Sequence, residues 1–313
     1  MNPLISIIIP TYNRSNLIGY TINSIIAQKY TNWECIIIDD GSSDDTCGVI
    51  SMFQKNEKRI KYFLREGSRL KGPSVCRNYG IKKAKGRFIQ FFDDDDLMYP
   101  ELLLKKVDLL IKKEVDVVVS KVDIFNVAKG EIIDQNNVES DDLIKHFILG
   151  KITWYVNGPI WKRKFLQEQF DESVQTLDDW DFNLRNIYNN PKISFINEAL
   201  CRYNRFGIGT SLSTKKRSRG KDQARSVFFV YKKHYKILKE KELLEKEIKV
   251  CLMRRFTFLL RSSLINKSSI STKIFAFIIK EHSILELRRI IAITLGYYSY
   301  LAFGRGYRFI KYI

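Results

Sequence analysis

The 313-residue sequence predicts an α/β protein: a mostly parallel sheet with flanking helices, followed by a basic helical C-terminal region. Apolar, β-branched runs alternate with segments of helical spacing over residues 4–120, as in βαβ units. From residue 215 onward the chain has helical spacing and no strand alternation. This last third holds 24 Lys and Arg against 7 Asp and Glu, whereas residues 1–214 hold 29 against 28. A nearly neutral body therefore carries a strongly basic C-terminal region.

Five strands are expected in the first half of the chain. The first, LISIIIP, is a continuous apolar run, which is typical of a strand buried on both faces. The second, ECIII, ends in an acidic pair, and the fourth, RFIQFF, runs directly into four aspartates. The five expected strands are residues 4–10, 34–38, 60–64, 87–92 and 115–120.

Helices are expected between these strands. The first has apolar residues at helical spacing, and the last begins with Pro100 in its first turn, where the missing N–H does no harm. The expected helices are residues 16–28, 43–53, 73–85 and 100–113. In the mixed segment 121–214, residues 141–149 and 178–188 look helical and residues 192–203 look extended. The basic region is expected to form helices at residues 218–241, 243–264, 272–282 and 284–302.

Acidic residues follow two of the expected strands. Asp39 and Asp40 close the second strand, and residues 93–96 (DDDD) close the fourth. The carboxyl ends of parallel strands form a common ligand crevice, so both clusters are expected to face one site. Oxygen ligands without His or Cys favour a hard ion such as Mg²⁺ or Mn²⁺, and we assign this role to Asp93 and Asp95 together. For Asp96 we favour a different role, which is to cap the following helix.

Cysteine and histidine usage excludes several classes of protein. The 5 cysteines form no CxxC pair, which excludes a zinc ribbon and a disulfide framework and favours a reducing cytosol. The 3 histidines are scattered, which argues against a His-rich metal site or a Ser-His-Asp triad. The first residues, MNPLISIIIPTYNR, lack the basic segment and cleavage site of a signal peptide, so we expect a cytoplasmic protein.

Four segments match the motifs of one known family, in the family's order and near its spacing. They are SIIIPTYNR (residues 6–14), IIIDDGSSDDT (36–46), RNYGIKKAKGRFIQFFDDDD (77–96) followed by Pro100, and FDESVQTLDDWDFNLR (170–185). With them the chain resembles the family 2 inverting glycosyltransferases, which have the Rossmann-like GT-A fold. The resemblance implies a GT-A domain over residues 1–214, followed by the basic region 215–313. Within that domain, residues 1–100 would bind the nucleotide sugar, and residues 101–214 would supply the acceptor site and catalytic base.

The resemblance also implies roles for residues near the nucleotide. Pro10, Thr11 and Tyr12 match the segment that wraps the base. Asp40 matches the carboxylate that accepts a hydrogen bond from the uracil N3–H, while its neighbour Asp39 is expected to support the loop. Arg77 matches a basic residue that commonly lies near the nucleotide.

Other residues match the family's catalytic positions. Asp93 and Asp95 fall on the two acidic positions of the DxD motif, with Asp95 as the direct ligand of Mn²⁺ or Mg²⁺ and Asp93 reaching the ribose or donor sugar. Asp94 fills the middle position, which some relatives also use. Asp179 matches the base that takes the proton from the acceptor hydroxyl as attack proceeds. Without the resemblance, Asp178 and Asp179 would be interpreted as an acidic pair at a helix N-terminus.

The sequence departs from the family pattern in two places. The His of the YRxH-like segment is missing from the run CRYNR at residues 201–205, where Arg202 or Arg205 is a candidate diphosphate contact. The QxxRW motif of processive synthases is also missing, since Gln223 is followed by Ala-Arg-Ser. The second departure favours the addition of one sugar at a time.

The basic C-terminal region has three candidate roles. Tyrosines and phenylalanines crowd the last 17 residues among basic side chains, a composition that suits a membrane interface with anionic lipid. The longest uncharged run, residues 290–304, is shorter than the roughly 20 residues needed to span a bilayer. We rank membrane-surface binding first, simple packing on the body second, and nucleic-acid binding third.

These observations together predict a metal-dependent inverting glycosyltransferase, cytoplasmic and peripheral on the inner face of the cell membrane. The expected partners are a nucleotide diphosphate sugar, by resemblance a UDP-sugar, and a lipid-linked glycan intermediate of O-antigen, capsule or another surface polysaccharide. One alternative is a nucleotidyltransferase, but the first strand is not followed by the Gly-rich triphosphate loop that such an enzyme needs. The other is a basic nucleic-acid-binding protein, which the charge alone would suggest.

Overall fold

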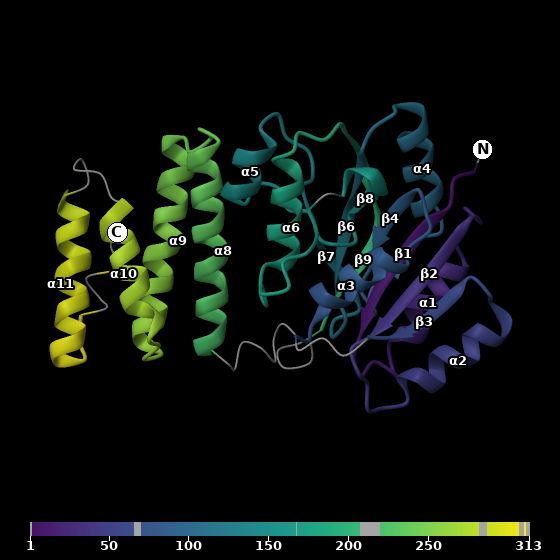
Figure 1. The fold of residues 1–313 in the computed structure, drawn as a ribbon, viewed down its shortest axis with the longest axis horizontal. Helices are drawn as coiled ribbons and strands as arrows, with labels where there is room; N and C mark the ends of the chain where they lie inside the picture. The colour runs from purple at the N-terminus through teal and green to yellow at the C-terminus, as the bar shows by residue number, and fades with distance from the viewer. Residues whose placement is uncertain are drawn as a thin grey trace. The chain divides into compact units, whose positions relative to one another are not determined.

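The computed structural model describes residues 2–65, 70–166, 168–206, 220–281, 287–306 and 310 of the chain. It divides into two compact units, drawn in Figure 1. The N-terminal unit comprises Met1–Ser173 and Asp178–Gly207, and the C-terminal unit comprises Val174–Leu177 and Ile208–Ile313. Each unit is described by itself below.

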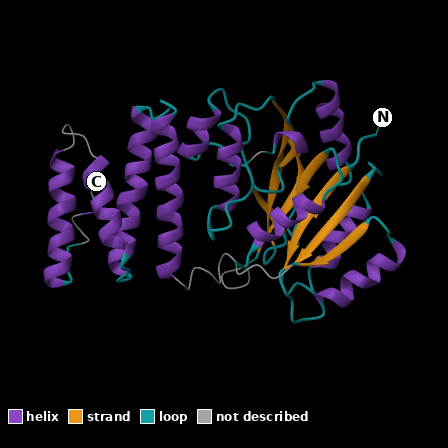
Figure 2. Cartoon of the chain, viewed as in Figure 1, coloured by secondary structure: helices purple, strands orange, loops and turns teal. Residues whose placement is uncertain are grey.

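One nine-stranded sheet forms the centre of the N-terminal unit, as Figure 2 shows in orange. Strands β3, β2, β1 and β4 pair in parallel, which is the βαβ arrangement that the alternating sequence predicts. In the other half, β8 is antiparallel to both β4 and β6, β9 is parallel to β6, and β5 and β7 are antiparallel edge partners of β9 and β6. In sheet order the strands are β3 (Ile60–Leu64), β2 (Trp33–Asp39), β1 (Ile5–Thr11), β4 (Phe88–Phe91), β8 (Pro159–Lys162), β6 (Val117–Asn126), β9 (Ile193–Arg205) and β5 (Leu97–Met98), with β7 (Glu131–Gln135) beside β6.

The expected elements of residues 4–120 are all present, with ends that differ by a few residues. The extended segment expected near residues 192–203 is β9. Three strands were not predicted, namely β5, β7 and β8. They have only two to five residues each, and unlike the equally short β3 and β4 they do not follow the regular strand–helix alternation of residues 4–120.

Helices cover both faces of this sheet because its central strands, such as β1 and β2, are buried on both faces. Along β1, Ile5, Ile7 and Ile9 join one hydrophobic core with residues of α1, α2 and α4. Ile8 points to the opposite face, where α3 crosses so closely that Gly80 lies against its side chain. The helices of this unit are α1 (Ile18–Ile26), α2 (Thr46–Asn56), α3 (Pro73–Lys83), α4 (Leu102–Lys112), α5 (Leu143–Leu149) and α6 (Asp178–Ile187), with a 3-10 turn at Arg163–Phe165.

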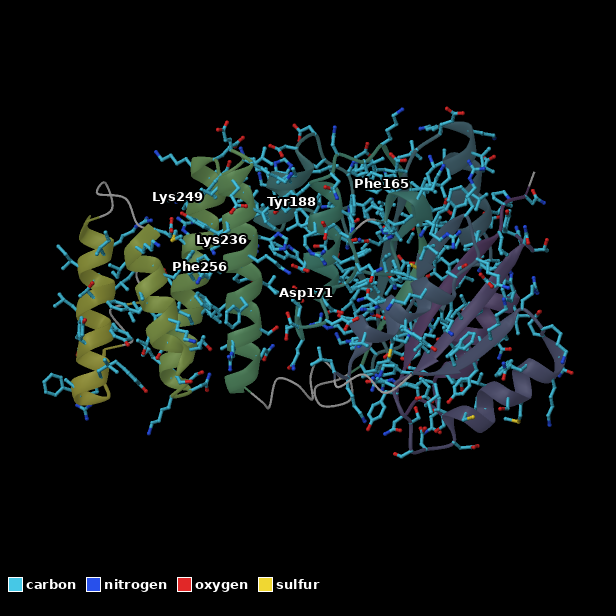
Figure 3. All side chains as sticks on the ribbon, viewed as in Figure 1. Phe165, Asp171, Tyr188, Lys236, Lys249 and Phe256 are labelled. Atoms are coloured by element: carbon cyan, nitrogen blue, oxygen red, sulfur yellow. The ribbon has the colours of Figure 1, made fainter. Side chains whose placement is uncertain are left out.

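The described part of the C-terminal unit is helical, with α8 (Gly220–Glu240), α9 (Lys246–Ile265), α10 (Ile270–Glu281) and α11 (Leu287–Phe303). Helices α8, α9 and α10 pack on one another around Phe256, which is labelled in Figure 3 and has ring contacts with Phe228, Tyr235 and Phe277. These helices match the expected ones, although residues 218–219, 282 and 284–286 of those expectations lie outside the described residues. Within the described ranges, no helix has both the length and the apolar character required to cross a membrane.

Candidate active site

The carboxyl ends of β1, β2 and β4 meet at one edge of the sheet. The β1–β2 register pairs Thr11 with Asp39, and the β1–β4 register pairs Ile8 with Phe91, two residues before the run of aspartates. The Asp40 backbone N–H donates to the carbonyl of Thr11 at 2.9 Å. The two acidic clusters therefore flank the end of β1, as the strand-end rule predicts.

Asp39 organises the turn that follows β2. Its Oδ1 accepts hydrogen bonds from the backbone N–H groups of Gly41 and Ser42 at 2.9 and 2.7 Å, and its Oδ2 accepts one from the Tyr62 hydroxyl. Gly41 has φ of +91°, which a glycine adopts without strain. The expected supporting role of Asp39 is confirmed.

The predicted nucleotide-contacting residues lie on this edge. Pro10 and Thr11 end β1 and are buried, and the Thr11 side chain faces Asp94, whose pKa it helps to lower. Tyr12 follows them and is exposed. Asp40 forms a buried ion pair through Oδ1 with Arg65, and its Oδ2 accepts no hydrogen bond from the described part of the chain. In the described part of the chain, an Asp40 oxygen without a hydrogen bond, the Thr11 hydroxyl and the exposed Tyr12 ring thus line the end of β1.

Arg14 connects the β1 loop to the acidic run. Its guanidinium pairs with Asp94 Oδ1 at 3.3 Å and with Asp95 Oδ2 at 3.4 Å. Its backbone N–H donates to Thr46 Oγ1, which fastens this loop to the segment after β2. We did not select Arg14 from the sequence, although consecutive carboxylates require a nearby cation and SIIIPTYNR contains one.

Even with Arg14 present, the acidic run is short of positive charge. Burial, then the neighbouring carboxylate of Asp95, raises the pKa of Asp94, while Arg14 lowers it. Burial, then Asp93, raises the pKa of Asp95, with Arg14 again opposing. Cations bound at this edge would relieve both the desolvation of these carboxylates and their mutual repulsion.

Asp96 does not cap the following helix, so that prediction is wrong. The short strand β5 follows it, and α4 begins at Leu102 with Glu101 as its N-cap residue. The Asp96 side chain is completely buried, where Asn157 Nδ2 and the Asn204 backbone N–H each donate to it at 2.8 Å. Burial raises its pKa. Asp96 therefore ties the acidic run to β9 and to the segment before β8.

Arg77 joins the acidic run to the predicted catalytic base segment. This buried guanidinium on α3 donates to Asp93 Oδ1 at 2.7 Å and to Asp178 Oδ2 at 2.8 Å. It also lies over the ring of Phe170, 5.1 Å from the centroid. Although burial lowers the pKa of Arg77, the charges of Asp93 and Asp178 outweigh it and raise the value overall. The bridge brings residues 101 positions apart in the sequence into one site.

Asp179 lies in the first turn of α6, next to the residue that Arg77 contacts. It is half-buried, and its Oδ1 accepts a hydrogen bond from the Trp180 backbone N–H at 2.8 Å. Burial first, and then the charge of Asp178, raises its pKa to about 7, while Arg77 lowers it. A carboxylate with a pKa near neutrality is suited to accept a proton at physiological pH.

Two stacked tyrosines border these carboxylates, and the sequence offered no signal for them. The rings of Tyr155 and Tyr203 lie 5.2 Å apart between centroids, at 12°. Both are half-buried, and neither hydroxyl has a hydrogen-bond partner among the described residues. The pKa of each is raised by burial first, and then by Asp179 at Tyr155 and by Asp96 and Asp93 at Tyr203. The pair thus lies within electrostatic range of both Asp179 and the acidic run.

The carboxylates fit a divalent ion that is shared with a ligand. In the described part of the chain, no three His, Cys, Asp or Glu side chains are grouped so that they alone would hold a metal. Mg²⁺-type sites commonly use only one or two carboxylates together with substrate phosphates. Asp93 and Asp95 are partly exposed and offer oxygen atoms of this kind.

Residues 6–173, more than half of the chain, match the model of the family described as "Glycosyl transferase family 2". The chain belongs to glycosyl transferase family 2. The matched region contains the strand-end acids and Arg77, and Asp178 and Asp179 lie just beyond it.

This family 2 chain also matches curated relatives over part of their length. It is 42% identical over 111 residues to the GalNAc(5)-diNAcBac-PP-undecaprenol β-1,3-glucosyltransferase of Campylobacter jejuni, covering 36% of this chain and 34% of that protein. It is 32% identical over 152 residues to the UDP-Glc:α-D-GlcNAc-diphosphoundecaprenol β-1,3-glucosyltransferase WfgD of Escherichia coli, covering 48% and 58%. In each case the match spans less than two thirds of the relative.

Solved structures support the GT-A fold of this family 2 chain. The structure of TarS residues 1–349 of Staphylococcus aureus with UDP-GlcNAc superposes with a TM-score of 0.58 at 19% identity, covering 95% of this chain and 80% of that one. The mannosyltransferase PcManGT of Pyrobaculum calidifontis, in complex with GDP-Man and Mn²⁺, gives 0.59 at 16% identity, covering 99% and 85%. At these identities the similarity establishes the fold.

Proposed function

We propose that the chain is a metal-dependent, inverting, non-processive glycosyltransferase that moves one sugar from a UDP-sugar to a hydroxyl of a lipid-linked glycan. The surface polysaccharide under construction would be O-antigen, capsule or a related polymer. The observation that carries this proposal is the Arg77 bridge from Asp93 to Asp178, because it holds the acidic strand end and the base segment in one site.

The nucleotide would bind at the end of β1. Pro10, Thr11 and Tyr12 would enclose the base, and the free oxygen of Asp40 would accept the uracil N3–H. Because Arg65 already holds the other oxygen of Asp40, this carboxylate is fixed before the ligand arrives. Arg77 and Asp94 would complete the surroundings of the diphosphate and sugar.

Asp95, with Asp93, would hold Mn²⁺ or Mg²⁺ together with diphosphate oxygens. When bound, the ion neutralises charge that develops on the leaving diphosphate. The acceptor hydroxyl would attack the anomeric carbon as the bond to the diphosphate oxygen breaks, and Asp179 would take the hydroxyl proton. Single displacement of this kind inverts the anomeric centre, so an α-linked UDP-hexose should yield a β-glycoside.

The acceptor class rests on the two named relatives, whose names specify undecaprenol-linked substrates. A lipid-linked acceptor would require the enzyme to work at a membrane surface. We assign that contact to the basic region 215–313, which would associate with anionic lipid on the inner face of the cell membrane.

A donor panel tests this proposal. UDP or GDP release would be measured with UDP- and GDP-sugars, with an undecaprenyl-diphosphate-linked sugar as acceptor, with Mn²⁺ and after EDTA treatment. We expect UDP release from at least one UDP-sugar, lost with EDTA and lost in Asp95→Asn. Release that survives thorough EDTA treatment would rule out the metal assignment, and retention of the anomeric configuration would rule out single displacement.

A further inference from the structure

One face of α11 is apolar and exposed in the described part of the chain. Leu295, Tyr298 and Ile291 are 61%, 58% and 49% exposed, and Ala302 is also exposed. These four positions are spaced by four, three and four residues, so they form one stripe along a helix. The stripe rises about 16 Å along the helix axis, at 1.5 Å per residue.

The opposite face of α11 is the one that packs within its unit. Tyr297 stacks on Phe275 of α10 with 4.0 Å between ring centroids, and its hydroxyl bonds to Thr272 Oγ1 at 3.1 Å. Ile293, one turn earlier, is completely buried. Tyr298 lies at the border of the two faces: its ring contacts Phe275 edge-on with 5.8 Å between centroids, while 58% of its surface stays exposed. Tyr297 and Ile293 turn the buried face of α11 toward α10, so Ile291 and Leu295 face away from that contact.

From the first residue of α11 to residue 313, every charged side chain is basic. Residues 290–304 contain no charged side chain, and residues 287–313 contain five Lys or Arg and no Asp or Glu. A second copy of the chain would bring an equally basic region against this one, which like-charge repulsion opposes. An anionic surface with an apolar interior, as in a bilayer, would attract the basic side chains and bury the exposed apolar stripe.

We propose that the outward face of α11, formed by Ile291, Leu295, Tyr298 and Ala302, inserts into the interfacial layer of an anionic bilayer with the helix lying in the membrane plane. A helix of 17 residues is about 26 Å long, shorter than the roughly 30 Å hydrocarbon core, so it lies along the surface. The inference deepens the proposed function, because a lipid-linked acceptor is presented at that surface.

Vesicle sedimentation of the full chain tests the inference. The vesicles would contain either phosphatidylcholine alone or phosphatidylcholine with 30% phosphatidylglycerol, a composition chosen as about typical of anionic membranes. The test variant is Ile291→Ser/Leu295→Ser. The matched control is Phe258→Ser, which removes an apolar side chain that is 71% exposed on α9 of the same unit. Both changes leave the packed face of α11 intact.

We expect wild type and Phe258→Ser to bind the anionic vesicles, and to bind them more weakly in high salt. The affinity of the double variant for the same vesicles should be lower by about tenfold or more, because two apolar side chains no longer insert. Equal binding by the double variant, or equal loss in Phe258→Ser, would overturn the inference. A wild-type dimer that the double variant dissociates would instead identify a second copy as the occupant. UDP binding is measured on every sample, so a failed vesicle result with intact UDP binding refutes only this inference. Absent UDP binding in wild type refutes the proposed function.

Discussion

At the scale of single residues, the acidic side chains of this site differ because of their neighbours. Asp39 is saturated by backbone and tyrosine donors and shapes a turn, while Asp96 is completely buried and anchors β9. Asp179 has one backbone donor and a repelling neighbour, so its pKa is raised to about 7. Of these three aspartates, Asp179 has the fewest stabilising partners, which supports the proposal that it moves the proton.

We expect Asp179→Asn to lower transfer by about 10²–10⁴-fold, the typical contribution of a general base, while UDP affinity stays the same. Turnover assays and UDP calorimetry measure the two effects. The control is Asp178→Asn, which leaves the base in place and keeps an oxygen that can accept from Arg77. If the control loses as much turnover as the test variant, the base assignment fails.

The rate should rise with pH through about 7. The pKa of Asp179 is raised by burial and by Asp178, so below about pH 7 the carboxylate is protonated and cannot accept the acceptor's proton. A profile of kcat/KM from about pH 5.5 to 8.5 should show this limb and then a plateau. Asp178→Asn removes a charge that raises the pKa, so it should move the limb to lower pH. A profile that is flat or falls with pH would contradict the assignment.

Arg77→Lys should reduce kcat more than UDP affinity. Arginine contacts Asp93 and Asp178 at once through its planar fork, whereas the single ammonium of lysine keeps the charge without that geometry. We expect kcat to fall about tenfold to hundredfold, since a small displacement of a catalytic group has effects of this size. If UDP affinity falls more than kcat, the main contribution of Arg77 is its contact with the nucleotide, and the bridge to Asp178 is secondary.

At the scale of elements, the close crossing of α3 over β1 positions Arg77. A Cβ placed on Gly80 would lie 2.3 Å from Ile8 Cγ2, so only glycine allows the helix to approach this closely. The same helix carries Arg77 one turn before Gly80. The distance between α3 and the sheet therefore helps to place the guanidinium at the strand ends.

Gly80→Ala should destabilise the protein by about 1–3 kcal/mol, because the new methyl group overpacks the contact with Ile8. The control is Gly19→Ala on α1, where a Cβ would meet Phe53 at an ordinary 3.6 Å. Both changes add a methyl group within a helix, where replacing glycine by alanine raises helix propensity by up to about 1 kcal/mol at an interior position such as Gly80 and by less in the first turn at Gly19. Thermal unfolding should show a lower Tm for Gly80→Ala and an unchanged or higher Tm for Gly19→Ala. The reverse order would refute the packing argument.

At the scale of the whole molecule, charge separates the two ends of the chain. Residues 215–313 carry a net charge of +17 and the remainder +1. The predicted site residues all precede residue 215, so the charged region and the transfer chemistry are separate in sequence. Salt screens the attraction of the basic region to an anionic surface, whereas sugar transfer within the site should depend less on salt concentration.

Turnover should therefore respond to salt differently with different acceptors. Raising NaCl from about 50 to 500 mM should reduce turnover on a lipid-linked acceptor in anionic vesicles several-fold, because the Debye length falls severalfold to well below 10 Å. Turnover on a soluble acceptor analogue should change little over the same range. Parallel loss on both acceptors would show that salt acts on the site itself and not on membrane attachment.

Local patterns in the sequence determined the parallel strands, their helices and the meeting of two acidic clusters at one sheet edge. Each depends on nearby residues and on the rule that parallel strands end together. The charged helical third was evident from composition. Family motifs pointed to Asp40, Asp93, Asp95 and Asp179 as site residues, and their roles remain predictions.

Only the tertiary structure decided how the acidic residues are partnered. Arg14 reaches Asp94 and Asp95 across about 80 positions, and Arg77 reaches Asp178 across 101. Asp96 was taken for a helix cap, because no local pattern shows that Asn204, 108 positions away, donates to it. The antiparallel pairing of β8 with β4 and β6 likewise joins segments that are far apart in the sequence. Pairings over such separations follow from how the whole chain packs, and periodicity reports only on neighbours within a few residues.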